Sequence, residues 1–144
     1  MLQNIAVGTD GSATAGHAVD FALDLAEKYG ARVLFLSSYH PVSESRLKQE
    51  KRDAPEDVQW SINPLEDVEA VLSEVEEKAE SRGLKWHSEA REGDPADVLC
   101  DLAGEHGADL LVIGNKGMHR RLIGSVPNSV SHKAPCSVAI VKTT

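Results

Sequence analysis

Short apolar runs alternate with helical patterns along the chain, and this alternation limits the possible folds more than any other feature. Four apolar runs have the length of a strand, at residues 5–7, 33–36, 110–113 and 137–141, and residues 84–90 alternate apolar and polar, as in an edge strand. Between them, apolar residues recur every three or four positions, as in amphipathic helices. Such alternation predicts one parallel sheet with helices on both faces, joined by right-handed crossovers. A length of 144 residues suits a single domain, so we expect one five-stranded α/β domain over residues 1–144.

Capping residues set the expected ends of the helices. Ser12 is expected to cap the first helix, and Pro64 and Gly83 to begin and end the second. Asp94 is expected to cap the third helix, after a turn at residues 91–93. The apolar face of the first helix is expected to consist of Ala18, Val19, Ala22, Leu25, Ala26 and Tyr29.

Residues 40–63 interrupt the alternation. They are rich in charge and contain two prolines, which predicts a long surface loop. Loops of this length are commonly lids or mobile segments. Trp60 in this loop either covers a ligand or anchors the loop to the body, and we favour the anchor. The basic residues of the loop alternate with acidic ones, which is typical of a solvated face.

Charge and hydropathy exclude several function classes. Fifteen basic and 23 acidic residues give a net charge of −8, whereas nucleic-acid binders present a basic face, so no nucleic-acid partner is expected. No apolar stretch reaches membrane-spanning length and no secretory signal is visible, so we expect no membrane partner and a cytoplasmic location. Cys100 and Cys136 lack the spacing of zinc ligands. We expect both to be small core residues and predict no metal site.

Residues 108–126 carry the main indication of a binding site. Their apolar run ends at Gly114, Gly117 and Gly124 follow, and Ser125 stands where the next helix is expected to begin. Glycines let backbone N–H groups approach an anion closely. A helix N-terminus adds unpaired donors and the positive end of its dipole. Taken alone, the pattern also fits a glycine-rich turn without a ligand, because short glycine motifs are weakly specific.

The loops that follow the buried strands favour the binding site. These loops are residues 8–12, 37–39 and 114–125. In sheets of this kind, ligands bind beyond the carboxyl ends of the strands, where the strand order reverses. If the first and fourth strands are neighbours, residues 8–12 and 114–125 meet at one crevice.

Five motifs together resemble the universal stress protein family. They are IAVGTDGS at 5–12, GDPA at 93–96, GADLLVIG at 107–114, GSV at 124–126 and APCSV at 134–138. The resemblance extends from Asn4 to Lys142, and the order and spacing of the motifs make it specific. It implies a doubly wound, Rossmann-like fold and commonly a homodimer. Members of the family divide into nucleotide binders and non-binders.

The nucleotide binders share a glycine signature. It runs glycine, two residues, glycine, nine residues, then glycine followed by serine or threonine. Here GNKG at 114–117 and GS at 124–125 match its two halves, but only six residues separate them, three fewer than in the signature. The phosphate loop is therefore shorter. Arg120 and Arg121 lie within it, and they either supply charge to phosphate oxygens or only add solubility.

The resemblance also implies roles for individual residues. Gly8, Thr9 and Asp10 would lie near the ribose and adenine, and the backbone around Ser37 would meet the adenine edge. The ribose and phosphates would be held by Gly114, Asn115, Gly117, Arg120, Arg121, Gly124, Ser125 and Val126.

Three functional hypotheses follow. The first is a stress-response sensor or reservoir that binds an adenine nucleotide. The nucleotide is either ATP, with which Mg²⁺ would bind, or cyclic AMP. A short phosphate loop suits the one phosphate of cyclic AMP better than the three of ATP. The second is a nucleotide-free dimeric interaction module with a degenerate phosphate loop. The third is a weak ATPase, which we rank last. No catalytic residue is assigned, because Asp10 is the one carboxylate expected in the crevice and the motifs of P-loop NTPases and hydrolases are absent.

Three further expectations concern residues outside the crevice. His87 is expected to face solvent without a catalytic role, and His106 to complement the dipole at the end of a helix. Residues 137–141 are expected to form an exposed apolar edge strand, which would pair with a second copy across a two-fold axis.

Overall fold

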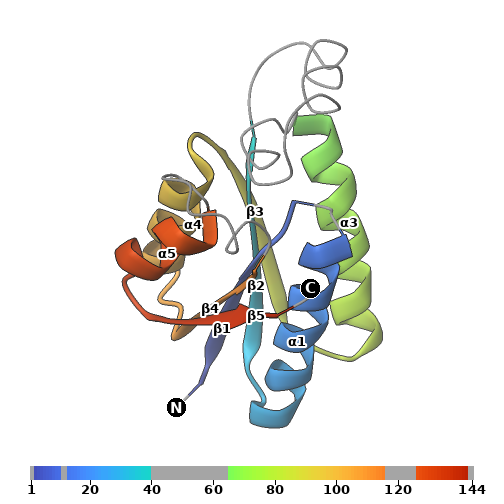
Figure 1. Cartoon of the computed structure of the whole chain (residues 1–144). Helices are drawn as coiled ribbons and strands as arrows, with labels where there is room; N and C mark the ends of the chain where they lie inside the picture. The colour runs from blue at the N-terminus through green and yellow to red at the C-terminus, as the bar shows by residue number, and fades with distance from the viewer. Residues whose placement is uncertain (1, 11–12, 40–64, 116–125, 143–144) are drawn as a thin grey trace.

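The strands that the structure describes form one parallel sheet (Figure 1). The computed structural model describes residues 2–10, 13–39, 65–115 and 126–142. Along the chain these contain β1 (Asn4–Gly8), α1 (Ala13–Tyr29), β2 (Arg32–Tyr39), α3 (Leu65–Ser81), β3 (Trp86–Glu92), α4 (Pro95–Glu105), β4 (Leu110–Gly114), α5 (Val126–Lys133) and β5 (Ser137–Val141). The strand order is β3-β2-β1-β4-β5, and every pairing is parallel. The predicted α/β fold is confirmed.

Helices cover both faces of the sheet. Helices α1 and α3 pack on one face and α4 and α5 on the other (Figure 1). Successive residues of a strand point to opposite faces, so Val33 and Phe35 of β2 join the first core, while Leu34 and Leu36 join the second. All four side chains are fully buried. Each such burial stabilises the fold by about 1.5–3 kcal/mol, so β2 anchors both layers.

The third strand differs from its prediction. It was expected at residues 84–90, but β3 spans Trp86–Glu92. The expected turn at 91–93 is therefore wrong for Arg91 and Glu92, which pair with Ser38 and Tyr39 of β2. β2 is itself longer than its predicted apolar run 33–36. Pairing between the two strands extends both of them past their apolar residues, which local hydrophobicity does not reveal.

The helix predictions are confirmed in most details. Asp94 caps α4, because its carboxylate accepts a hydrogen bond from the Asp97 backbone N–H at 3.1 Å. In α1 the apolar face includes the fully buried Leu23, which the prediction omitted, and Tyr29 is 54% exposed rather than packed. Tyr29 is the last residue of the helix. Ser12, Pro64 and the predicted loop 40–63 lie outside the described residues.

Other expectations have mixed outcomes. Cys100 is buried as expected, whereas Cys136 is only partly buried beside the second core. β5 is an edge strand, as predicted. Among the described residues, no helix is long and apolar enough to cross a membrane.

Candidate functional site

The strand order reverses between β1 and β4. The two strands are paired, with Ile5 opposite Leu110 and Val7 opposite Val112, as the crevice prediction requires. The chain leaves β1 for α1 on one face of the sheet, and the next described helix after β4 is α5 on the other face. Connections that diverge in this way leave a crevice at the carboxyl ends of the two strands.

The end of β1 is fixed by hydrogen bonds to β2. The Thr9 backbone N–H donates to the Leu36 carbonyl at 3.1 Å. The Ser37 hydroxyl donates to the Thr9 carbonyl at 2.7 Å. Thr9, Asp10 and Ser37 are 2%, 8% and 1% exposed. The backbone at the carboxyl ends of β1 and β2 is therefore held in place by hydrogen bonds within the protein.

The end of β4 is held in the same way by β5. Gly114 lies opposite Val141, and the Asn115 backbone N–H donates to the Val141 carbonyl at 3.0 Å. Val126, the first residue of α5, is buried in the second core. Both ends of the predicted phosphate loop are thus attached to the folded body.

The structure brings together one part of the predicted site. Gly8, Thr9, Asp10 and Ser37 meet at the ends of β1 and β2, and Gly114 and Asn115 follow on the neighbouring β4. Val126 lies at the start of the helix after the loop. The remaining predicted residues, Gly117, Arg120, Arg121, Gly124 and Ser125, lie outside the described part of the chain.

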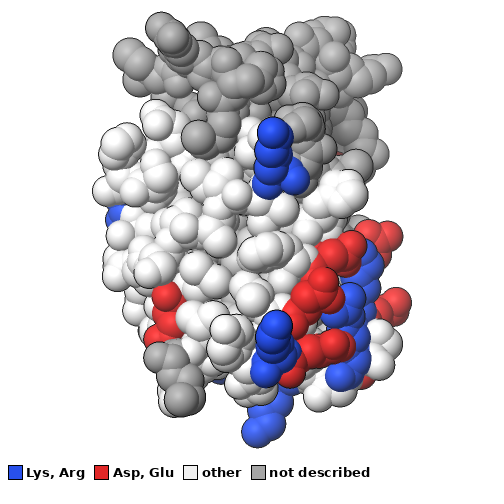
Figure 2. Space-filling view, turned by 60° about the horizontal axis from the view of Figure 1, so that its bottom comes forward, with Lys and Arg blue, Asp and Glu red and all other residues white. Residues whose placement is uncertain are grey.

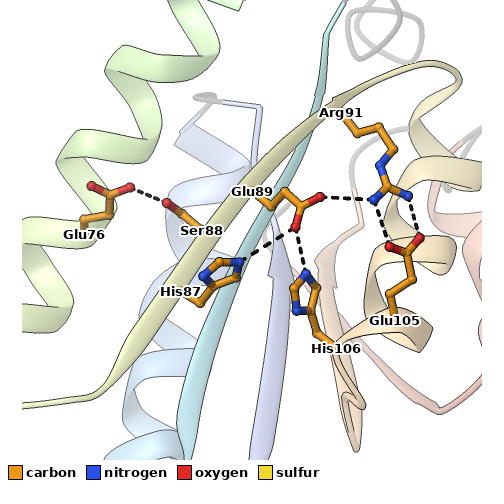
Figure 3. A network of polar contacts seen from close by, with 7 residues as sticks. All are labelled: Glu76, His87, Ser88, Glu89, Arg91, Glu105 and His106. Carbon is orange, nitrogen blue, oxygen red and sulfur yellow. Dashed lines mark hydrogen bonds and ion pairs between the residues drawn. The ribbon is translucent and has the colours of Figure 1, made fainter.

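A second group of polar residues lies between β3 and the C-terminal end of α4 and was not predicted as a group (Figure 3). Glu89 accepts a hydrogen bond from His106 at 2.8 Å, which is the largest influence lowering the pKa of this carboxyl. Arg91 contributes further, with Nη2 at 3.1 Å from the second carboxylate oxygen. Glu105 binds Arg91 through two bonds, of 2.5 and 2.8 Å, and this contact raises the pKa of the guanidinium.

The sequence contains a partial signal for this group. His87, Glu89 and Arg91 are spaced by two, so a strand places them on one face. The expectation that His87 simply faces solvent is incomplete, because its ring centroid lies 4.8 Å from that of His106. His106 is the C-cap residue of α4. Only the tertiary structure, in which α4 packs on the neighbouring β2, shows that this end of the helix meets the polar face of the strand.

Comparisons with known proteins agree with the fold and the motifs. A model of the universal stress protein family matches residues 1–142. A universal stress protein of Mycobacterium tuberculosis is 37% identical, with 99% of this chain and 97% of that protein covered. One of Methanocaldococcus jannaschii is 31% identical, with coverage of 99% and 83%. The crystal structure of a universal stress protein in complex with cAMP is 31% identical, with a TM-score of 0.77 and coverage of 99% and 98%.

Proposed function

The chain belongs to the universal stress protein family, and on that premise we propose that it binds an adenine nucleotide at the carboxyl ends of β1 and β4. The observation that carries the proposal is the reversal of strand order at this pair of strands. The similar structure at 31% identity that holds cAMP supports the same ligand class. The protein would act in the cytoplasm as a sensor or reservoir in the stress response.

Each part of the crevice suits one part of such a ligand. The hydrogen bonds at Thr9 and Ser37 hold in one conformation the backbone that would lie along the adenine edge. Asp10 offers a carboxylate for the ribose hydroxyls, which are hydrogen-bond donors. Gly114 and Asn115, together with the N-terminus of α5, would face the ribose and phosphates, because helix N-termini favour anions.

Among adenine nucleotides we favour cyclic AMP over ATP. The segment between the two halves of the glycine signature is three residues short, which leaves less backbone to surround a triphosphate. The cAMP complex of a similar protein points the same way. ATP with Mg²⁺ remains the second ligand to test.

Isothermal titration of the full chain with cyclic AMP, AMP, ADP and ATP tests this proposal. We expect saturable binding with about one nucleotide per chain and the highest affinity for cyclic AMP. Asp10→Asn keeps the shape of the side chain but removes its charge, and it should weaken binding about 10- to 100-fold, the usual value of a hydrogen bond to a charged group. Asp101→Asn on the exposed surface of α4 is the matched control and should bind as the wild type does.

The rival functions predict other outcomes. A nucleotide-free interaction module gives no heat with any of the four ligands, and native mass spectrometry then shows no co-purified nucleotide. A weak ATPase releases phosphate from ATP, and the release disappears in Asp10→Ala. Either pattern would replace the sensor or reservoir role.

We also propose that the protein is a homodimer joined along β5. β5 is an edge of the sheet, so one row of its backbone groups has no neighbouring strand among the described residues. Ile140 on this strand is 37% exposed, which is high for a large apolar side chain. In Figure 2 charged side chains gather over α1 and α3, and few lie in the middle of the same face. Pairing two copies edge to edge would cover the apolar strand.

Light scattering at micromolar concentration tests the dimer. We expect twice the chain mass for the wild type and the monomer mass for Ile140→Lys, because a charge at the paired edge opposes association. Tyr29→Lys, at an exposed apolar position at the end of α1, is the control and should remain dimeric. A monomeric wild type would refute the proposal.

A further inference from the structure

One face of β3 brings two histidines and a glutamate to the same point (Figure 3). His87 and Glu89 are two residues apart on the strand and therefore share a face. Trp86 points the other way, into the core formed with α1 and α3. His106 reaches the same face from the C-cap of α4. The three side chains meet because α4 packs on β2, the neighbour of β3, and its C-cap residue reaches Glu89.

The distances between these side chains approach those of a metal site. One oxygen of Glu89, Oε1, lies 2.8 Å from His106 Nε2 and 3.7 Å from His87 Nε2. The candidate ligand atoms of all three residues lie within 4.8 Å of one another. Around a tetrahedral Zn²⁺ with bonds of about 2.1 Å, ligand atoms are about 3.4 Å apart. The two distances to Glu89 lie on either side of this value, and an ion would take the place of the hydrogen bond between Glu89 and His106.

The second oxygen of Glu89 is already occupied. Arg91 Nη2 lies 3.1 Å from Glu89 Oε2, on the side away from the histidines. The charge of Arg91 is balanced by its two bonds to Glu105. This arrangement fixes the orientation of Glu89 and leaves Oε1 directed at both imidazoles. Ligating carboxylates are commonly oriented by such an outer hydrogen bond.

Solvent reaches the cluster without any opening of the core. The side chains of His87, Glu89 and His106 are 43%, 30% and 23% exposed. An ion bound there would keep water in its remaining coordination positions, as zinc sites with three protein ligands do.

We propose that His87, Glu89 and His106 form a binding site for a divalent first-row transition ion, with Zn²⁺ as the reference case. Two imidazole nitrogens and one carboxylate oxygen suit Zn²⁺, Ni²⁺ and Cu²⁺ better than Mg²⁺ or Ca²⁺, which prefer oxygen ligands. The bound ion would clamp the edge strand β3 to the end of α4. The site is separate from the nucleotide crevice and does not depend on it.

The test titrates the full chain, first stripped with EDTA and exchanged into chelator-free buffer, with ZnCl₂ in a calorimeter. We expect about one Zn²⁺ per chain and a rise in the melting temperature with Zn²⁺ concentration. His87→Gln and His106→Gln should each weaken binding at least about tenfold. His17→Gln and His132→Gln alter exposed histidines on α1 and α5 and should bind as the wild type does. Asp10→Asn should also bind Zn²⁺ normally, which separates this site from the nucleotide site.

A second readout reports the ligands directly. Co²⁺ bound by two imidazoles and a carboxylate gives visible absorption that His87→Gln should abolish or alter. Circular dichroism melting of each variant without metal shows that it is folded, and the exposed His87 provides the comparison if His106→Gln does not fold. Absence of saturable Zn²⁺ binding in the wild type would overturn the proposal. Wild-type Zn²⁺ affinity in folded His87→Gln would overturn it as well.

Discussion

The hydrogen bond between Ser37 and Thr9 gives a direct test of how the crevice is built. The Ser37 hydroxyl, 1% exposed, donates to the Thr9 carbonyl at 2.7 Å and ties the end of β2 to the segment after β1. Ser37→Ala removes this donor and leaves the backbone and Cβ unchanged. The substitution therefore tests this one interaction, with little change in apolar packing.

The expected magnitude follows from the burial of the partner. A typical hydrogen bond contributes about 1 kcal/mol, but a buried acceptor that loses its donor costs about 1–3 kcal/mol. Thr9 is 2% exposed, so water does not readily replace the lost donor. For 144 residues, the unfolding entropy is about 0.3 kcal/mol/K, which converts this loss into a fall in melting temperature of roughly 3–10 °C.

A matched control separates the effect of losing a buried hydrogen bond from the effect of losing a serine hydroxyl as such. The Ser81 hydroxyl donates to the Lys78 carbonyl at 2.8 Å, but at an exposed position near the end of α3. Ser81→Ala should change stability by no more than about 0.5 kcal/mol, because water replaces the lost partner. Melting temperatures from calorimetry and midpoints from urea unfolding are compared for the wild type and both variants.

The nucleotide affinity of Ser37→Ala adds a functional readout. If Ser37 and Thr9 hold the backbone at the adenine edge, cyclic AMP should bind the variant several-fold more weakly at a temperature where the variant is fully folded. A melting temperature lowered no more by Ser37→Ala than by Ser81→Ala would refute the energetic reasoning. Unchanged affinity in a destabilised variant would refute the link to the ligand.

Three further predictions concern stability. Gly93→Ala should lose about 1–3 kcal/mol in urea unfolding, because Gly93 has a φ of 143° and an added Cβ would lie 3.1 Å from Val98 Cγ2. Leu99→Ala should lose about 2–5 kcal/mol by the same measurement, since it removes a fully buried side chain of α4 from the second core. The Asp109 carboxylate accepts hydrogen bonds from the backbone N–H groups of Gln3 and Asn4, which lower its pKa below the usual 3.8. The stability that this contact adds is therefore present above pH 4 and is lost as the pH falls through the lowered pKa. The difference in urea midpoint between the wild type and Asp109→Asn should accordingly shrink below pH 4.

Much of the fold could be predicted because its signals are local. Apolar runs, glycines after helices and the cap at Asp94 act within a few residues, and the structure confirms the strands and helices they indicate. The sequence also predicted where a ligand would bind, because alternating strands and helices give a parallel sheet whose loops meet at one edge. The paired β1 and β4 agree with that reasoning.

Tertiary structure alone decided which distant residues meet. Arg91 and Glu92 became part of β3 because hydrogen bonds to β2 outweigh their polar character. Cys136 stayed partly exposed and Tyr29 largely so, because burial depends on what packs above a residue as well as on its hydrophobicity. The cluster of His87, Glu89 and His106 forms where the end of α4 lies beside β3. A periodic pattern assigns a side chain to a face of its own element, but the partner across that face depends on how the elements pack.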